Sequence, residues 1–463
     1  MTEARQTSCS MTKVLFISYY FPPEGGTGVQ RSAKFVRYLP EEGFLPVVLA
    51  GPEPLRFGSF QPCDPSLNTP ANISVYRVPG EPPRRGKLQQ RLERWFSLPT
   101  SFSRWWVKSS LKLAEKTGDQ ARLVYATMSP FESAQAASRI SAQLGIPWVA
   151  DLRDPWALDE VILYPTLLHR KVDLFRMRRV LSTASLVVMN TPEAMKVLAR
   201  ALPVLAPRLV TITNGVDNPE DGRSLPTRTH SKFRIVHSGG FSTGTGLQLR
   251  RRRFYRLLGG AEPGVDILAR SPLFLVKAVQ EWCSQQPDAA DNVEIVLAGK
   301  ALPEDHALVR QSRVAHLFRF VGFVSHDESL DLIRTANLLF LPMHNLPPGK
   351  RSTTIQAKMY EYIASGRPIL AAVPDGDARD FLAQSGNAFV CRPDDVRGMV
   401  QVLQNVYTAW KDGRMPIEPR PGFMAQFDSR ILTKALADGF RFVLGQSPPS
   451  HLEVRHRPDM SSR

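Results

Sequence analysis

Short apolar runs alternate with amphipathic stretches along most of this chain. The first run, Val14–Tyr20, leads through a glycine-rich turn into Val29–Leu39, where apolar residues recur at helical spacing. Gly43 ends that predicted helix, and Pro46–Ala50 is the next apolar run. A strand, a helix and a second strand in this order predict a βαβ unit and therefore a parallel sheet.

The same alternation continues to residue 213 and begins again at residue 233. Further strands of the first half are predicted over Leu123–Thr127, Pro147–Asp151, Leu186–Asn190 and Leu209–Thr213. Strands of the second half are predicted over Phe233–Gly240, Val293–Gly299, Leu317–Phe323, Leu338–Pro342, Pro368–Val373 and Ala388–Cys391. Ser325 with Glu328 has the spacing of a capping box, and Ser271 with Pro272 marks another helix start.

This organisation predicts an α/β fold with two Rossmann-like parallel-sheet domains that face each other across a cleft. We assign residues 12–213 to the N-terminal domain, 214–232 to a linker rich in turn formers, and 233–415 to the C-terminal domain. We further expect a loop insertion at 242–270, a helical segment at 416–446 that crosses back to the N-terminal domain, and a disordered polar tail at 447–463. Ligands of parallel sheets bind beyond the carboxyl ends of strands, so the loops that follow strands are where chemistry is expected.

Composition narrows the class of protein. Hydrophobic residues make up 43% and charged residues 22%, which excludes a disordered or fibrous chain. The 59 basic and 43 acidic residues give a net charge of +16, which favours phosphorylated ligands, anionic lipid or nucleic acid. Four scattered cysteines exclude a zinc ribbon or a disulfide scaffold. With no apolar run of about 18 residues, no spanning helix is expected, and we expect a cytoplasmic location.

The first loop that could carry chemistry is Phe21–Arg31, between a predicted strand and a predicted helix. Gly25, Gly26 and Gly28 allow close backbone approach at a helix N-terminus, which favours an anion. A dinucleotide fingerprint needs a third glycine where Arg31 stands, so a nicotinamide or flavin site is disfavoured. A tight turn without a ligand is the remaining alternative.

Seven segments, in a fixed order, resemble one known family. They are Tyr19–Gly51, Ala150–Trp156, Ser185–Met195, Ile212–Asp217, Val296–Lys300, Val321–Pro342 and Ala357–Leu370. Together they resemble family-4-type glycosyltransferases with the GT-B fold, over roughly residues 12–240 and 271–440. The resemblance implies a nucleotide-sugar-dependent transferase with the donor mainly on the C-terminal domain and the acceptor mainly on the N-terminal domain. It also implies retention of anomeric configuration, no metal and no cofactor, the nucleotide-sugar being a substrate.

The resemblance implies donor-binding residues in the C-terminal domain. Glu361 resembles a glutamate that binds the nucleotide ribose, and Thr353 stands where the family often has a second glutamate that contacts the sugar. Lys358, one helical turn before Glu361, is a candidate for phosphate contact and catalysis; a surface lysine–glutamate pair is the alternative. Thr354 offers a hydroxyl to the diphosphate at the start of the same helix.

Three further residues are candidates for the donor phosphates. Gly240 belongs to a loop, SGGF, that resembles the first loop of the family's second domain. Arg270 is the candidate for a basic residue before a helix, and Lys300 follows the segment VLAG. Cations aimed at the phosphate oxygens of a nucleoside diphosphate leaving group would lower the barrier to transfer.

On the acceptor side, we expect a loop of Gly25, Gly26, Thr27 and Gly28 to lie near Asp151, Arg153 and Asp154, all of them facing the cleft. Asp154 is the candidate catalytic carboxylate that holds an acceptor hydroxyl. The alternative is that these carboxylates cap a helix and pair with Arg153. No general base is assigned, because in a retaining mechanism the donor phosphate itself can take the acceptor proton.

Residues 84–116 hold nine basic and two acidic residues. Five aromatic residues are interleaved with them: Trp95, Phe96, Phe102, Trp105 and Trp106. Basic charge with aromatic residues is what an anionic membrane surface attracts, so this segment is predicted to dock peripherally on the inner face of the membrane. A helix pair with an aromatic core is the alternative.

Three functions are consistent with these observations to different degrees. The leading hypothesis is a cytoplasmic glycosyltransferase of cell-envelope polysaccharide or glycolipid biosynthesis, acting on a polysaccharide, glycan or lipid-linked acceptor. Thr353 and the insertion motivate a second hypothesis, a catalytically weak relative that serves as a binding or assembly subunit. Nucleic acid is not an expected partner, because charge is its only support and no nucleic-acid-binding motif is present.

Overall fold

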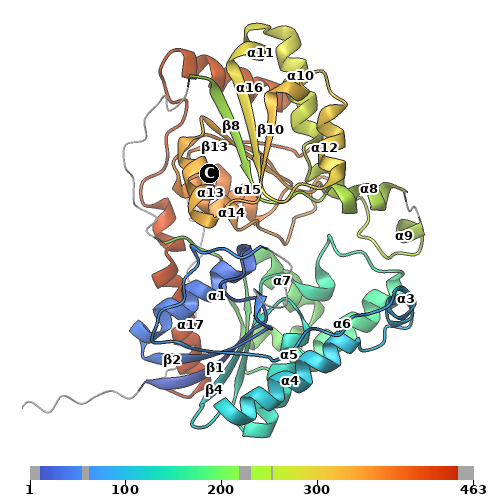
Figure 1. Cartoon of the computed structure of the whole chain (residues 1–463), viewed down its shortest axis with the longest axis vertical. Helices are drawn as coiled ribbons and strands as arrows, with labels where there is room; N and C mark the ends of the chain where they lie inside the picture. The colour runs from blue at the N-terminus through green and yellow to red at the C-terminus, as the bar shows by residue number, and fades with distance from the viewer. Residues whose placement is uncertain (1–10, 55–61, 218–230, 252–253, 447–463) are drawn as a thin grey trace, which may run out of the picture.

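Two parallel sheets, one in each half of the chain, form the framework of the molecule (Figure 1). The computed structural model describes residues 11–54, 62–217, 231–251 and 254–446. The first sheet has seven strands in the order β3-β2-β1-β4-β5-β6-β7, and the second has six in the order β10-β9-β8-β11-β12-β13. All neighbouring strands within the two sheets are parallel. The predicted fold class, two parallel-sheet α/β domains, is confirmed.

Every predicted strand is present, with ends that differ by at most two residues. The first sheet consists of β1 (Thr12–Ser18), β2 (Phe44–Ala50), β3 (Ser74–Arg77), β4 (Leu123–Met128), β5 (Trp148–Leu152), β6 (Leu186–Met189) and β7 (Leu209–Thr211). The second consists of β8 (Phe233–Ser238), β9 (Val293–Ala298), β10 (Phe318–Gly322), β11 (Leu338–Pro342), β12 (Ile369–Ala372) and β13 (Ala388–Cys391). Only the edge strand β3 was not predicted, because its half-exposed residues include no apolar run.

Helices cover both faces of each sheet. Those of the first half are α1 (Thr27–Tyr38), α3 (Lys87–Trp95), α4 (Ser101–Thr117), α5 (Glu132–Leu144), α6 (Leu167–Leu181) and α7 (Pro192–Ala201). Those that follow are α8 (Thr243–Arg251), α9 (Phe254–Leu257), α10 (Leu273–Gln285), α11 (Asp288–Asn292), α12 (Pro303–Arg310), α13 (His326–Thr335), α14 (Lys358–Ala364), α15 (Asp377–Ser385), α16 (Val396–Lys411) and α17 (Ser429–Val443). Strands covered on both faces become continuously apolar, and β4 is buried along its whole length.

Two predicted helix starts have the expected caps. The Ser325 hydroxyl accepts from the backbone N–H of Glu328, whose carboxylate accepts from the N–H of Ser325, so the capping box is confirmed. Helix α10 begins at Leu273, whose N–H donates to the Ser271 hydroxyl at 3.1 Å. These local bonds fix the helices that follow the sheet edge where ligands are expected.

The segment 242–270 is not the loop insertion that the sequence predicted. It contains α8, α9 and a 3-10 turn at Ile267–Ala269. Its apolar residues Leu249 and Tyr255 are buried in a small core that also receives Val161 and Leu163 from the first domain. The insertion folds into helices because the neighbouring domain covers its apolar side chains.

The C-terminal segment returns to the first domain through α17. The rings of Phe440 and Phe44 meet edge to face at 5.3 Å, and Arg441 forms an ion pair with Glu42 at 2.9 Å. Most of the predicted linker (residues 218–230) and the predicted disordered tail (447–463) lie outside the described residues. None of the helices in the described parts of the chain has the length and hydropathy needed to cross a bilayer.

Candidate functional site between the two sheets

Each sheet reverses its strand order once, and the two reversal points mark where a ligand is expected. The first lies between β1 and β4, and the second between β8 and β11. In open parallel sheets the crevice at such a point is the usual ligand site. The two domains meet there: the backbone N–H of His326 donates to Asp64 at 2.8 Å, and a side chain on Gly25 would contact Phe323.

A buried ion pair holds α1 at the first reversal point. Gly26 caps the helix with φ 107°, a conformation that favours glycine. Arg31 then donates to both oxygens of Asp151 at 2.9 Å, and Tyr125 donates to Asp151 at 2.5 Å. Asp151 is fully buried and its oxygens are occupied. It does not face the cleft, so its assignment to the acceptor loop is wrong: the last residues of β5 point into the protein rather than beyond the sheet.

Arg153 lies across the first turn of α1, which begins at Thr27. It donates to the carbonyl oxygens of Met128 and Ser129, the second at 3.0 Å. A Cβ on Gly28 would lie only 1.6 Å from Arg153 Nη1. Glycine is therefore required at position 28 for the guanidinium to reach a helix N-terminus, where anions are favoured.

A cavity of about 390 Å³ opens beside this turn. It is lined by Gly25, Gly26, Gly28, Arg153 and Asp154, with Asn190, Asn214 and Ala357 among its other residues. Asn190 is 4% exposed, and among the described residues its Oδ1 has no hydrogen-bond partner. Asn190 was not among the residues predicted from the sequence, although its place directly after β6 was a signal for it.

An acidic group stands next to this cavity. Burial raises the pKa of Asp154. Burial, followed by the charges of Asp154 and Glu160, raises the pKa of Asp159 to about 8. Asp159 therefore takes up a proton at higher pH than an exposed aspartate does, whereas the charges of Arg153 and Arg270 oppose the effect of burial on Asp154.

Lys358 and His237 face each other on the second domain. Lys358 Nζ donates to His237 Nε2 at 3.3 Å, and His237 Nδ1 donates to the Phe340 carbonyl oxygen at 2.9 Å. Burial, together with the charge of Lys358, lowers the pKa of His237 well below 6.5, so the imidazole is neutral. A Cβ on Gly239, which has φ 113°, would lie 2.5 Å from Lys358 Nζ, so glycine makes room for the lysine.

Arg270 is the second cation of this group. Burial and the charge of Arg270 lower the pKa of Lys358 well below its usual value. Arg270 Nε is buried and has no hydrogen-bond partner among the described residues, while the charge of Asp154 acts against the effect of burial on the Arg270 pKa. Two buried cations with so few partners form a site suited to an anion.

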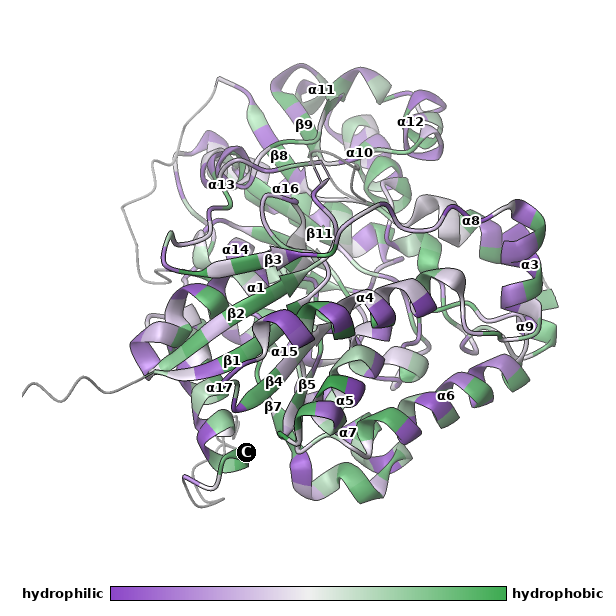
Figure 2. Cartoon of the chain, turned by 60° about the horizontal axis from the view of Figure 1, so that its bottom comes forward, coloured by the Kyte–Doolittle hydropathy of each residue, from purple (hydrophilic) through white to green (hydrophobic). Residues whose placement is uncertain are grey.

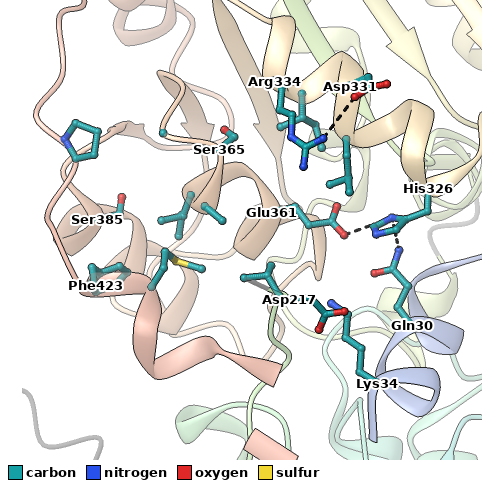
Figure 3. Close-up of a pocket in the computed structure, with 18 of the residues that line it drawn as sticks. Gln30, Lys34, Asp217, His326, Asp331, Arg334, Glu361, Ser365, Ser385 and Phe423 are labelled. Atoms are coloured by element: carbon teal, nitrogen blue, oxygen red, sulfur yellow. Dashed lines mark hydrogen bonds and ion pairs between the residues drawn. The ribbon is translucent and has the colours of Figure 1, made fainter. Parts of the chain in front are cut away.

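Glu361, one turn beyond Lys358, lines a larger cavity of about 1210 Å³ (Figure 3). Its Oε1 lies 3.7 Å from His326 Nδ1, which is 2.9 Å from Gln30 Nε2. In Figure 3 the carboxylate of Glu361 points toward His326, above Lys34. The alternative interpretation, a surface pair of Lys358 and Glu361, is wrong, because Lys358 is buried against His237 and Glu361 is half-buried beside His326.

Thr353 and Thr354 contact a carboxylate from the other domain. Glu160 accepts from the Ser352 hydroxyl at 2.7 Å, from the Thr353 N–H at 3.1 Å and from the hydroxyls of both threonines. Burial alone would raise the pKa of Glu160, but the hydrogen bond and charge interaction with His344, together with hydrogen bonds from Thr353 and Ser352, lower it to about 2. The Thr354 hydroxyl is therefore engaged between the domains. Nothing in the sequence indicated this contact.

The remaining donor candidates lie at strand ends outside this group. Gly240 follows β8 with open space around it, and Lys300 is exposed after β9 and lines neither cavity. Within the described ranges, no group of three or more His, Cys, Asp or Glu side chains is placed to hold a metal ion.

Comparison with known proteins assigns the chain to a class. A family model described as "Glycosyl transferase 4-like domain" matches residues 26–215, and one described as "Glycosyl transferases group 1" matches residues 269–409. A search of the curated proteins finds no significant match. The chain is a glycosyltransferase with the GT-B fold. Within that class it belongs to the enzymes with a family-4-like N-terminal domain.

Solved structures share the fold at low sequence identity. HepE from Anabaena, in complex with UDP and glucose, has a TM-score of 0.56 at 15% identity over 93% of this chain and 100% of that one. Sucrose-phosphate synthase from Thermosynechococcus elongatus has a TM-score of 0.61 at 15% identity over 94% and 100%. A glycosyltransferase from Rickettsia africae has a TM-score of 0.59 at 9% identity over 94% and 100%.

Proposed function

We propose that this enzyme transfers a sugar from a nucleoside diphosphate sugar to a polysaccharide, glycan or lipid-linked acceptor, with retention of configuration and without a metal ion. The observation that carries the proposal is the pair of buried cations, Lys358 and Arg270, at the second reversal point between the domains. A diphosphate would add the negative charge that these two cations favour beyond what Asp154 and Glu361 supply.

The residues suggest a path for the donor. Glu361, at one end of the group, accepts two ribose hydroxyl hydrogen bonds. Lys358 and Arg270 hold the diphosphate, and the sugar extends toward the smaller cavity at Gly25–Gly28. The charge interactions follow the same order, since Lys358 interacts with both Glu361 and Arg270, and Arg270 with Asp154.

The same groups account for the chemistry. As the bond from the sugar to the diphosphate breaks, negative charge grows on the phosphate oxygens, and fixed cations in a water-poor site stabilise it. Asp154 orients the acceptor hydroxyl from the first domain. The departing phosphate takes the hydroxyl proton on the face that it leaves, which gives retention. Because side-chain cations neutralise the leaving group, this mechanism needs no metal.

HepE supports the choice of donor class. Its structures were solved with UDP, with UDP-glucose, and with UDP and glucose. A shared fold together with a buried cation pair makes a uridine diphosphate sugar the first donor to test. Cell-envelope polysaccharide or glycolipid biosynthesis at the inner face of the membrane would be consistent with such a donor.

A thermal-shift screen against nucleoside diphosphates and their sugar conjugates tests the proposal. A ligand that binds only the folded state raises the melting temperature by mass action. We expect one nucleotide series to shift the wild type and to shift Glu361→Gln much less, while Asp331→Asn, which lines the same cavity, behaves like the wild type. If no nucleotide shifts the wild type, the donor assignment is wrong.

A second candidate function is a binding or assembly subunit with weak catalysis. It is favoured by Glu160, which occupies the hydroxyls of Thr353 and Thr354 between the domains. The test is to measure nucleotide binding and the release of nucleoside diphosphate in the presence of a broad acceptor panel. Binding of ordinary strength without any release would favour this candidate over the transferase.

A further inference from the structure

Large apolar side chains are exposed at one side of the molecule. On α3 and the turn after it they are Leu88, Leu92, Trp95, Phe96 and Leu98; on α6 they are Leu167, Leu168 and Phe175; and on α9 and the residue after it they are Phe254, Leu257 and Leu258. Leu257 is 86% exposed, and Leu168 is 67% exposed. Figures 1 and 2 both place α3, α6 and α9 at this side. We call these side chains the apolar patch.

Contacts between the three segments show that they lie side by side. The ring of Trp95 lies 5.8 Å from that of His169 on α6, and His169 Nε2 is 2.8 Å from the Trp95 carbonyl oxygen. The N–H of Leu167 donates to the Leu258 carbonyl oxygen at 2.8 Å. Arg94 on α3 lies over the ring of Tyr255 on α9 at 5.9 Å. The patch therefore includes parts of both domains.

The charge around the patch has one sign. The exposed basic residues of α3, α6 and α9 are Lys87, Arg91, Arg94, Lys171, Arg178, Arg179 and Arg256. The helices α3, α6 and α9 contain only two acidic residues, Glu93 and Asp173. Glu93 is buried and accepts from Gln89 and Ser101, and Asp173 accepts from the Tyr164 hydroxyl at 2.6 Å. Apolar side chains thus project through a surface whose unpaired charge is positive.

The other aromatic residues of 84–116 do not contribute to the patch. Trp106 is fully buried and donates to the Ser133 hydroxyl at 3.2 Å, while Phe102 and Trp105 pack against the core of the first domain. For these residues the helix with an aromatic core, which was the alternative interpretation, is correct. Only α3 and its following turn remain available for a membrane surface.

We propose that the apolar patch is the site at which this enzyme docks on an anionic lipid bilayer, and that residues of both domains insert together. Exposed Leu, Phe and Trp side chains enter the boundary between headgroups and acyl chains, and the surrounding arginines and lysines contact anionic headgroups. An apolar patch with a basic rim fits this partner better than a second, equally basic copy of the chain, since like charges would oppose each other.

The position of the patch fits the site already described. A short segment, residues 159–167, connects the interdomain contact of Glu160 with Leu167, the first residue of α6 and a member of the apolar patch. A bilayer docked on the patch would therefore lie close to the acceptor side of the cleft. The inference rests on the proposed function only in taking the acceptor to be lipid-linked. Docking itself is independent of which nucleotide binds.

Cosedimentation with lipid vesicles tests the proposal. We expect the full chain to pellet with vesicles of phosphatidylcholine containing about one third phosphatidylserine, to pellet far less with phosphatidylcholine alone, and to be released by salt. The variant Leu168→Glu/Leu257→Glu, with one change in each domain, should bind roughly tenfold more weakly. The control Val204→Glu/Ile431→Glu changes two apolar residues of moderate exposure elsewhere and should bind like the wild type.

Three outcomes would overturn the proposal. The first is wild-type protein that stays in the supernatant with phosphatidylserine vesicles, and the second is a patch variant that pellets as well as the wild type. The third is a dimer of the free protein that the patch variant converts to a monomer, which would make the patch a self-association surface. Nucleotide binding measured without lipid separates this test from that of the proposed function, because it does not depend on the patch.

Discussion

Replacing Lys358 with methionine should raise the stability of the free protein and weaken nucleotide binding. Lys358 is 7% exposed, and its one described hydrogen bond is to His237. Methionine keeps the apolar stem and removes the charge. A buried polar group with too few partners costs about 1–3 kcal/mol, so we expect the melting temperature to rise by a few degrees.

The pH dependence of this gain has a definite sign. The pKa of Lys358 is lower in the folded protein, so the unfolded chain binds more protons and wild-type stability rises with pH up to the unfolded pKa near 10.4. The melting temperature of Lys358→Met should therefore exceed that of the wild type most at neutral pH, and the difference between the two melting temperatures should shrink as the pH approaches about 10. Melting curves between pH 7 and pH 10 measure it.

Nucleotide binding should change in the opposite direction. A hydrogen bond to a charged group contributes about 1.5–3 kcal/mol, so calorimetry should find uridine diphosphate binding weakened roughly 10- to 150-fold. The control is Lys277→Met, an exposed lysine over the ring of Phe274 on the same domain, which should change neither quantity. A Lys358→Met protein that melts earlier yet binds nucleotide like the wild type would refute the reasoning, because Lys358 would then be structural.

Three other substitutions test further parts of the account. Arg31→Met leaves Asp151 charged and buried, so urea unfolding should show a loss of about 3–5 kcal/mol; a loss under about 1 kcal/mol would contradict this. Gly28→Ala must displace Arg153, so turnover should fall at least tenfold with little change in melting temperature, and unchanged turnover would argue against a role for this turn. In the folded protein the pKa of Glu160 is about 2, below its value of about 4.3 in an unfolded chain. The charged carboxylate therefore stabilises the fold by about 3 kcal/mol above about pH 4.3, and this stabilisation is lost as the pH falls toward 2. Glu160→Gln should remove that part of the acid sensitivity in melting curves; an unchanged acid profile would count against this interdomain contact.

The sheets and the first glycine loop could be predicted because their signals are local. Each strand is an apolar run that ends at a turn, and Gly25–Gly28 lie in the turn after the first of these runs. Asp151 was misplaced because a residue at the end of a strand points either beyond the sheet or into a core, and the partner that decides, Arg31, is 120 residues away. Asn190, like Asp154, is a polar residue that follows a strand of the first sheet, so the same criterion could have predicted it.

Contacts between the domains could not be predicted from local patterns. Glu160 and Thr353 are 193 residues apart, and neither sequence context indicates a buried partner. The insertion was assigned to a loop for the same reason, because its apolar residues are covered by Val161 and Leu163 from the other domain. Long-range complementarity of this kind is visible only once both sheets are in place.

The central claim is that Lys358 and Arg270 bind the diphosphate of a nucleotide sugar. Titration calorimetry with uridine, its monophosphate and its diphosphate, on the wild type and on Arg270→Met, tests it most directly. The account predicts that affinity rises with each phosphate in the wild type and that the gain from the second phosphate is largely lost in the variant. Equal affinity of wild type and Arg270→Met for the diphosphate, or no binding of any of the three, would contradict it.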